Sequence, residues 1–203
     1  MTNTTARQEL HARQNAAAAA DRRRSRWTRW LSWSAALTVV ALIAGMLLTS
    51  QTTSATTSNT APDFTLPTTA DTTATLSTLR GKPVLLYFSE GAGCGACIMQ
   101  MEEIEKRRAD FDALGITVLP IVMNTKAAIT ADLTRYGVTT PFLLDDGTAS
   151  KAYHTLGKGM HAGLPGHSFV LIDAAGVQRW YGEYPSMWLD PSTLLDEIRT
   201  RLR

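Results

Sequence analysis

The sequence contains only two cysteines, and this scarcity limits the chemistry that they can perform. They lie three positions apart, as Cys94 and Cys97 of a Cys-Gly-Ala-Cys motif. A structural zinc site takes four ligands, and the chain has no second cysteine pair to complete one. An inert structural disulfide is also disfavoured, because closing so short a loop adds little stability. We therefore expect a redox-active pair.

The segments around the pair support thiol–disulfide chemistry. The apolar run at residues 83–88 predicts a buried strand, and a stretch of helical period follows from Gly95 to about Leu114. A strand, a C-x-x-C motif and a helix in this order are typical of redox sites. A helix start carries unpaired N–H groups and partial positive charge, which favour a thiolate at Cys94. Cys97, one turn further on, is then placed to attack a mixed disulfide on Cys94.

Acidic residues are scarce at the start of the chain, where residues 1–29 hold seven arginines against Glu9 and Asp21. Residues 30–48 then run for 19 positions without a charge. At about 1.5 Å per residue this stretch spans roughly 28 Å, close to the hydrocarbon thickness of a bilayer. Arginines on one side only predict that the N-terminus stays in the cytoplasm. We expect a basic cytoplasmic arm at 1–29 and a single transmembrane helix at 30–48, acting as an uncleaved signal-anchor.

A cleaved signal peptide is the alternative for this segment. Its apolar core would be shorter, and it would end in an A-x-A-like site, which is missing after Leu48. A buried helix of a soluble protein is a further alternative, which the length and the basic flank disfavour. Residues 49–60 contain nine Thr or Ser in twelve positions and are interpreted as a linker, with glycosylation left open.

Residues 61–203 are long enough for one ordinary domain. They carry 13 Lys or Arg against 16 Asp or Glu and no nucleic-acid motif, so no nucleic-acid partner is expected. Alternating strand-like and helix-like patterns predict an α/β core with parallel strand pairs. The expected strands are 64–66 with 74–76 as a hairpin, 84–88, 116–123 with Pro120 at an edge or bulge, 142–144, 168–173 and 178–181. The expected helices are 95–114, 127–136 ended by Gly137, 148–156, and 191–202 capped by Asp190.

Four features of this domain resemble a known family. They are APDFTL, LRGKPVLLYF, the cysteine motif, and SFVLID followed by a glycine turn, in this order over residues 61–203. Together they resemble the redoxin branch of the thioredoxin superfamily. That branch joins alkyl hydroperoxide reductase/thiol-specific antioxidant proteins to membrane-anchored disulfide reductases. The resemblance implies a thioredoxin-like fold, with a central mixed sheet flanked by helices and the C-x-x-C where the first core strand meets its helix.

Three positions depart from the family pattern. Gly93 replaces the usual aromatic residue before the first cysteine, and we expect a more mobile approach loop that exposes Cys94. Gly91 lies where related peroxidases carry Thr or Ser, three positions before the cysteine, so a peroxidase role is disfavoured. Pro165 is the candidate for the cis-proline that the family places opposite the cysteines, although it lies one position early; an ordinary turn proline is the alternative.

Two other side chains are candidate supporting residues. Glu90 could relay a proton during exchange, against the alternative of a solvated loop carboxylate. His167 could stabilise the thiolate or bind metal, against the alternative of a polar residue at a strand start. A copper site would combine Cys94, Cys97 and His167, because soft sulfur and imidazole suit copper.

These observations predict a membrane-anchored, extracytoplasmic thiol–disulfide oxidoreductase that uses Cys94 and Cys97 and needs no cofactor. Its expected partners are protein thiols and disulfides outside the cytoplasm, and its electron donor or acceptor is left open. A thiol peroxidase with antioxidant activity and a copper-delivery module are the alternative functions.

Overall fold

The computed structural model describes residues 30, 32–45, 52–157 and 162–203. The chain divides into two compact units, Met1–Ser50 and Gln51–Arg203. In the first unit, residues 30 and 32–45 are helical and solvent-exposed. Among the described residues, no helix combines the length and the apolar character that crossing a membrane requires. The basic arm at 1–29 and part of the expected span at 30–48, residues 31 and 46–48, lie outside the described residues.

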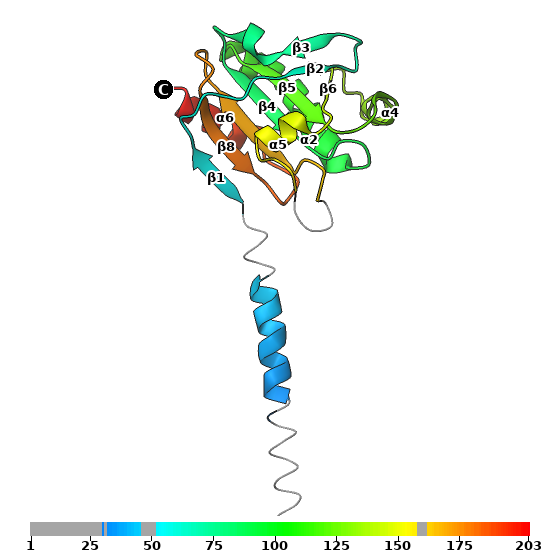
Figure 1. Cartoon of the computed structure of the whole chain (residues 1–203), viewed down its shortest axis with the longest axis vertical. Helices are drawn as coiled ribbons and strands as arrows, with labels where there is room; N and C mark the ends of the chain where they lie inside the picture. Colours follow the sequence, from blue (N-terminus) through cyan, green and yellow to red (C-terminus); the bar gives the residue numbers. More distant parts are fainter. Residues whose placement is uncertain (1–29, 31, 46–51, 158–161) are drawn as a thin grey trace, which may run out of the picture. The chain divides into compact units, whose positions relative to one another are not determined.

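The second unit is built on a six-stranded mixed sheet (Figure 1). Its strand order is β1-β8-β7-β4-β5-β6, in which β4 pairs parallel with β5 and β5 with β6, while the other neighbours are antiparallel. The strands are β1 (Thr53–Thr56), β4 (Val84–Phe88), β5 (Thr117–Val122), β6 (Leu143–Leu144), β7 (Ser168–Ile172) and β8 (Gln178–Glu183). This is the central mixed sheet that the family resemblance implies.

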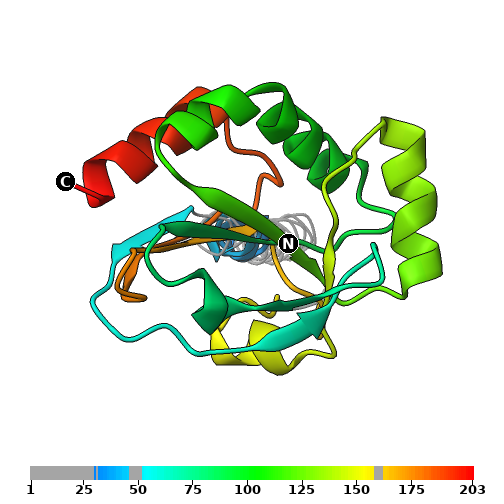
Figure 2. The ribbon, with the colours of Figure 1, turned by 90° about the horizontal axis from the view of Figure 1, so that it is seen from above.

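Helices cover one face of the sheet, and a short helix with a hairpin covers the other (Figure 2). The first layer holds α2 (Gly95–Lys106), α3 (Arg108–Ala113), α4 (Lys126–Tyr136) and α6 (Pro191–Arg201); the second holds α5 (Thr148–Ala152), η1 (Leu76–Leu79) and the hairpin of β2 (Thr65–Pro67) and β3 (Thr73–Thr75). Strand β4 contributes side chains to the cores on both sides of the sheet, because successive side chains of a strand point to opposite faces. Leu85 and Tyr87 join the core under α2, and Leu86 and Phe88 join the core under α5.

Part of the segment interpreted as a linker is a strand of the sheet. Residues 53–56 form β1 and pair antiparallel with β8 at the sheet edge. All four residues of β1 are exposed, so they add no side chains to the core. Strand pairing needs backbone groups rather than apolar side chains, and β-branched threonine favours extended backbone. The linker interpretation of 49–60 is therefore wrong for these residues.

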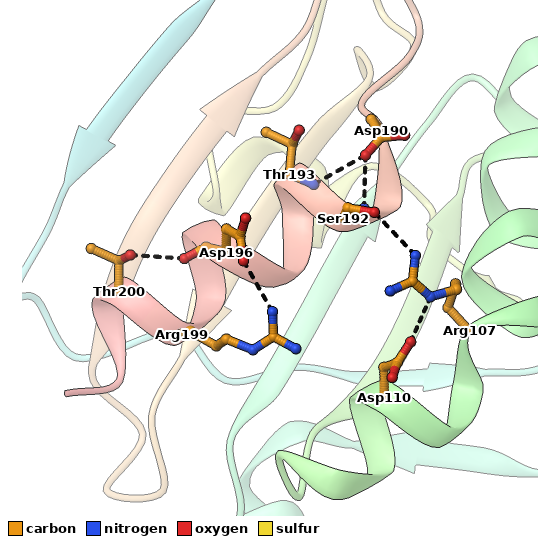
Figure 3. Close-up of polar contacts among 8 residues, drawn as sticks. All are labelled: Arg107, Asp110, Asp190, Ser192, Thr193, Asp196, Arg199 and Thr200. Atoms are coloured by element: carbon orange, nitrogen blue, oxygen red, sulfur yellow. Dashed lines mark hydrogen bonds and ion pairs between the residues drawn. The ribbon is translucent and has the colours of Figure 1, made fainter.

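The predicted helix over 95–114 is divided in two at Arg107. The backbone of Arg107 leaves the helical region, at φ −101° and ψ 15°, and separates α2 from α3. Its guanidinium pairs with Asp110 and donates a hydrogen bond to Ser192 Oγ of α6 at 3.1 Å (Figure 3). The expected cap of α6 is confirmed, since Asp190 Oδ1 accepts from the N–H groups of Ser192 and Thr193. These contacts fix α6 beside the helix that carries the cysteines.

Strand β5 is internal, so the expected edge position of Pro120 is wrong. Thr117 N donates to Pro83 O and Ile121 O accepts from Ser89 N, so odd-numbered residues of β5 bond toward β4. Pro120 therefore directs its nitrogen to the other side, where β6 pairs only with Ile121 and Val122. A proline is tolerated there because no neighbouring strand needs its missing N–H.

Candidate active site

The two cysteines lie at the start of α2, directly after the loop that leaves β4. Cys94 is the N-cap residue and Cys97 lies in the first turn, and the two form a disulfide with a Cα–Cα distance of 5.3 Å. Cys97 N–H donates to Cys94 Sγ at 3.3 Å, so the helix start already directs a donor at this sulfur. Cys94 is half-buried, whereas Cys97 is 0% exposed. The accessible sulfur is thus the one at the positive end of the helix.

The loop before Cys94 is held in place by hydrogen bonds. Ala92 N donates to Asn124 Oδ1 and Gly93 N donates to Asp132 Oδ2, both at 2.8 Å. Within the loop, Cys94 N donates to Gly91 O at 3.0 Å. The loop is thus anchored on α4 and on the segment before it, where we expected a Gly-rich approach of greater mobility. Neither anchor was predicted, because Asn124 and Asp132 are distant in sequence and only the fold brings them here.

Gly91 is required in this loop for two reasons. Its φ of +74° lies in the left-handed region that side chains disfavour. A Cβ on Gly91 would also lie 2.0 Å from Asn124 Oδ1 and 2.7 Å from Val122 Cγ1. The position three before Cys94 consequently has no room for the Thr or Ser hydroxyl of related peroxidases.

A buried polar cluster lies behind the disulfide and includes the predicted candidate His167. Tyr87 Oη lies 3.0 Å from Cys97 O and 3.2 Å from His167 Nδ1. His167 Nε2 lies 3.3 Å from Gln100 Oε1, which also accepts from Leu189 N at 2.8 Å. Tyr87 and Gln100 were not predicted as site residues. The sequence did contain a signal for them: strand and helical periodicity direct both side chains into the core, where a polar group is unusual.

Burial gives His167 an unusual protonation equilibrium. The ring is 1% exposed, and desolvation of the charged form lowers its pKa from 6.5 to about 4. The imidazole is therefore neutral at physiological pH while the disulfide is intact.

This shift predicts that the oxidised protein loses stability as the pH falls from 6.5 toward 4. In that window the unfolded chain binds a proton on His167 that the folded chain does not, so stability rises with pH. The contribution is fully present above pH 6.5 and its loss approaches about 3 kcal/mol below pH 4. Urea unfolding of the oxidised chain across this range measures it. His167→Gln should remove this part of the pH dependence, and an identical dependence in wild type and variant would contradict the prediction.

Glu90 and Pro165 contribute differently from His167. Glu90 is half-buried between β4 and the cysteine loop. No peptide bond is cis among the described residues, so the cis interpretation of Pro165 is wrong. Pro165 instead forms a bridge with Leu156, flanked by a hydrogen bond from Gly166 N to Thr155 O at 2.7 Å. It is the turn proline of the alternative interpretation.

A metal site is not assembled in the described part of the chain. No group of three or more His, Cys, Asp or Glu side chains lies there in an arrangement that could hold a metal ion. Both ring nitrogens of His167 already contact Tyr87 and Gln100. In this structure, His167 is therefore engaged with protein groups at both nitrogens that the copper-delivery alternative would use.

The strand–C-x-x-C–helix unit on a mixed sheet with covered faces defines a thioredoxin-like thiol oxidoreductase. The chain belongs to the AhpC/TSA family, whose profile matches residues 57–180. It is 29% identical to peroxiredoxin 2 of Thermoplasma acidophilum over 145 residues, which cover 68% of this chain and 70% of that protein. It is 26% identical to chloroplastic peroxiredoxin Q of Triticum aestivum over 119 residues, 59% of this chain and 55% of that protein.

Solved structures support the same fold. Reduced 2-Cys peroxiredoxin from Plasmodium vivax matches with a TM-score of 0.63 at 20% identity, covering 72% of this chain and 96% of that one. A proposed protein disulfide isomerase from Bacteroides thetaiotaomicron matches with a TM-score of 0.56 at 28% identity, covering 72% of this chain and 89% of that one. The family and these neighbours agree with a thiol-based redox enzyme.

Proposed function

We propose that this protein is a thiol–disulfide oxidoreductase that exchanges disulfides with other proteins through Cys94 and Cys97. One observation carries the proposal: a half-buried cysteine caps the start of α2, and a fully buried cysteine lies within disulfide distance in the first turn. The reduced Cys94 thiolate attacks a substrate disulfide and releases one substrate thiolate. The Cys97 thiol then loses its proton and attacks Cys94 Sγ, which releases the second substrate thiolate and leaves the enzyme oxidised.

Peroxide reduction is the second candidate, because curated relatives are named peroxiredoxins. Fast peroxide reduction needs hydrogen-bond donors that polarise the O–O bond beside the thiolate. The hydroxyl position of related peroxidases is occupied by Gly91, where a Cβ would collide with Asn124. Disulfide exchange requires no such pocket.

We predict that the reduced chain exchanges readily with a protein disulfide but consumes hydrogen peroxide no faster than a free thiol of low pKa. Stopped-flow oxidation followed by tryptophan fluorescence measures the second rate, with Cys94→Ser as the control. Oxidation several orders of magnitude faster than a model thiolate, and lost in Cys94→Ser, would favour the peroxidase instead. Failure to exchange with any protein disulfide would overturn the proposed function.

We further propose that the protein is anchored in the cell membrane by residues 30–48, with the redoxin domain outside the cytoplasm. The support is the charge pattern, with seven arginines before an uncharged stretch of 19 residues. In this location the substrates are protein thiols and disulfides outside the cytoplasm.

A reporter that is active only outside the cytoplasm, fused after Arg203, should be active in cells, and the product should keep its full mass. Activity of only a cytoplasmic reporter would reject the orientation. A product shortened by about fifty residues would reject the anchor and support the cleaved signal peptide.

A further inference from the structure

The hydrogen-bond partners around His167 determine where its protons must be. A backbone N–H can only donate, so the Gln100 atom that meets Leu189 N at 2.8 Å is the amide oxygen. The same oxygen lies 3.3 Å from His167 Nε2. Two acceptors cannot bond to each other, so His167 Nε2 carries a hydrogen in this arrangement.

At the other ring nitrogen, a single hydroxyl faces two acceptors. Tyr87 Oη is 3.2 Å from His167 Nδ1 and 3.0 Å from the carbonyl oxygen of Cys97. A neutral ring with its hydrogen on Nε2 leaves Nδ1 bare, so the Tyr87 hydrogen binds either Nδ1 or Cys97 O. An imidazolium donates from Nδ1 to Tyr87 Oη and frees the hydroxyl for Cys97 O. All the contacts are satisfied together only when His167 is a cation.

We propose that Tyr87, His167 and Gln100 are positioning residues whose hydrogen-bond chain is completed when the dithiol is reduced. With the disulfide intact, the Tyr87 hydroxyl donates to Cys97 O and His167 is neutral, so its bare Nδ1 receives no hydrogen. When Cys94 becomes a thiolate, His167 takes up a proton on Nδ1 and donates it to Tyr87 Oη, while Tyr87 keeps its hydrogen bond to the first turn of α2. The inference rests on the proposed dithiol chemistry and adds the proton that accompanies it.

The proposed step balances without a proton from solvent. A dithiol R(SH)2 gives two electrons and two protons to the enzyme and leaves as the disulfide R(S–S). The Cys94–Cys97 bond breaks, Cys94 becomes a thiolate, Cys97 keeps one proton as a thiol, and His167 holds the second as an imidazolium. The positive and negative charges formed are equal, so the site as a whole gains no net charge.

The groups in contact with the His167 ring and carbonyl carry no negative charge. The ring of Phe169 from β7 lies edge-on, and Tyr184 N, directly after β8, donates to the His167 carbonyl. Burial raises the pKa of Tyr87 well above 10 and that of Tyr184 to about 12, so both stay neutral. Glu183, which is paired with Ser168 between β8 and β7, is the acidic residue beside this segment. Its Oε1 would lie 3.6 Å from a Cβ built on Gly166.

The decisive measurement is the 15N NMR spectrum of the His167 ring in the full-length chain at pH 7. The chain has four histidines, and the His167 ring is assigned through its own backbone resonances. We expect a neutral ring protonated on Nε2 in the oxidised protein, and a ring protonated on both nitrogens after reduction with dithiothreitol. A ring that stays neutral in both states, or an oxidised form protonated on Nδ1, would overturn the proposal.

A second measurement tests the effect on the dithiol. Absorbance at 240 nm follows thiolate formation in the reduced chain, and His167→Gln should raise its pH midpoint by about one unit or more, because the imidazolium that Tyr87 links to the first turn of α2 is lost. The matched control is His154→Gln, since His154 is exposed, and it should leave the midpoint unchanged. Equal midpoints in wild type and His167→Gln would reject the coupling. Dithiothreitol serves as the reductant throughout, so these results stand apart from whether the protein exchanges with protein disulfides.

Discussion

Replacing Cys97 by Ser should convert the protein into a trap that holds its partners as stable mixed disulfides. Cys94 can still attack a partner disulfide, because it is the half-buried sulfur at the start of α2. The second step fails, because it needs the thiol of Cys97 to attack Cys94 Sγ and release the partner. Non-reducing electrophoresis and mass spectrometry of the adducts measure the result.

The matched variant is Cys94→Ser, which keeps the buried thiol and removes the accessible one. Cys97 is 0% exposed, so a folded partner cannot reach it, and we expect on the order of tenfold fewer adducts than with Cys97→Ser. Overall exchange should be lost in both variants. Equal trapping by the two variants, or alkylation of Cys97 before Cys94 at neutral pH, would contradict the assigned roles.

Gly91→Ala should destabilise the protein strongly. An alanine at φ +74° is strained by roughly 1–2 kcal/mol, and its Cβ would also collide with Asn124 Oδ1 and Val122 Cγ1. Overpacking of this kind adds about 1–3 kcal/mol. The hydrogen bond from Ala92 N to Asn124 is lost when Asn124 moves away, so the exchange rate should fall as well. Thermal unfolding should show a loss of roughly 5–15 °C in Tm.

Gly93→Ala separates the two causes of this loss. Gly93 has a similar φ of +90°, but no atom lies within 4 Å of a Cβ built there, and its N–H to Asp132 is retained. This variant should show only the cost of the backbone conformation, roughly 1–2 kcal/mol, with the dithiol geometry preserved. Equal losses of Tm in the two variants would show that the contact with Asn124 does not constrain the loop.

The sequence by itself determined the features that depend on neighbouring residues. Four such features form as predicted: the strand β4 from its apolar run, a helix directly after Cys94, the cap of α6 at Asp190 and the end of α4 at Gly137. Each depends on side-chain periodicity or on one capping residue, and both are visible within a few positions. The dithiol at a helix start belongs to the same class, because a helix end and its charge are local properties.

The tertiary structure alone decided the features that join distant segments. Asn124 and Asp132 anchor the loop before Cys94, and the Tyr87–His167–Gln100 chain joins β4, α2 and the start of β7. Strand β1 forms because β8 offers an unpaired edge, which the composition of residues 53–56 does not reveal. The local pattern predicts which face of a strand or helix each of these side chains occupies, but it does not predict the hydrogen-bond partner. That partner is set only in the assembled fold, because every buried donor and acceptor there requires a hydrogen bond.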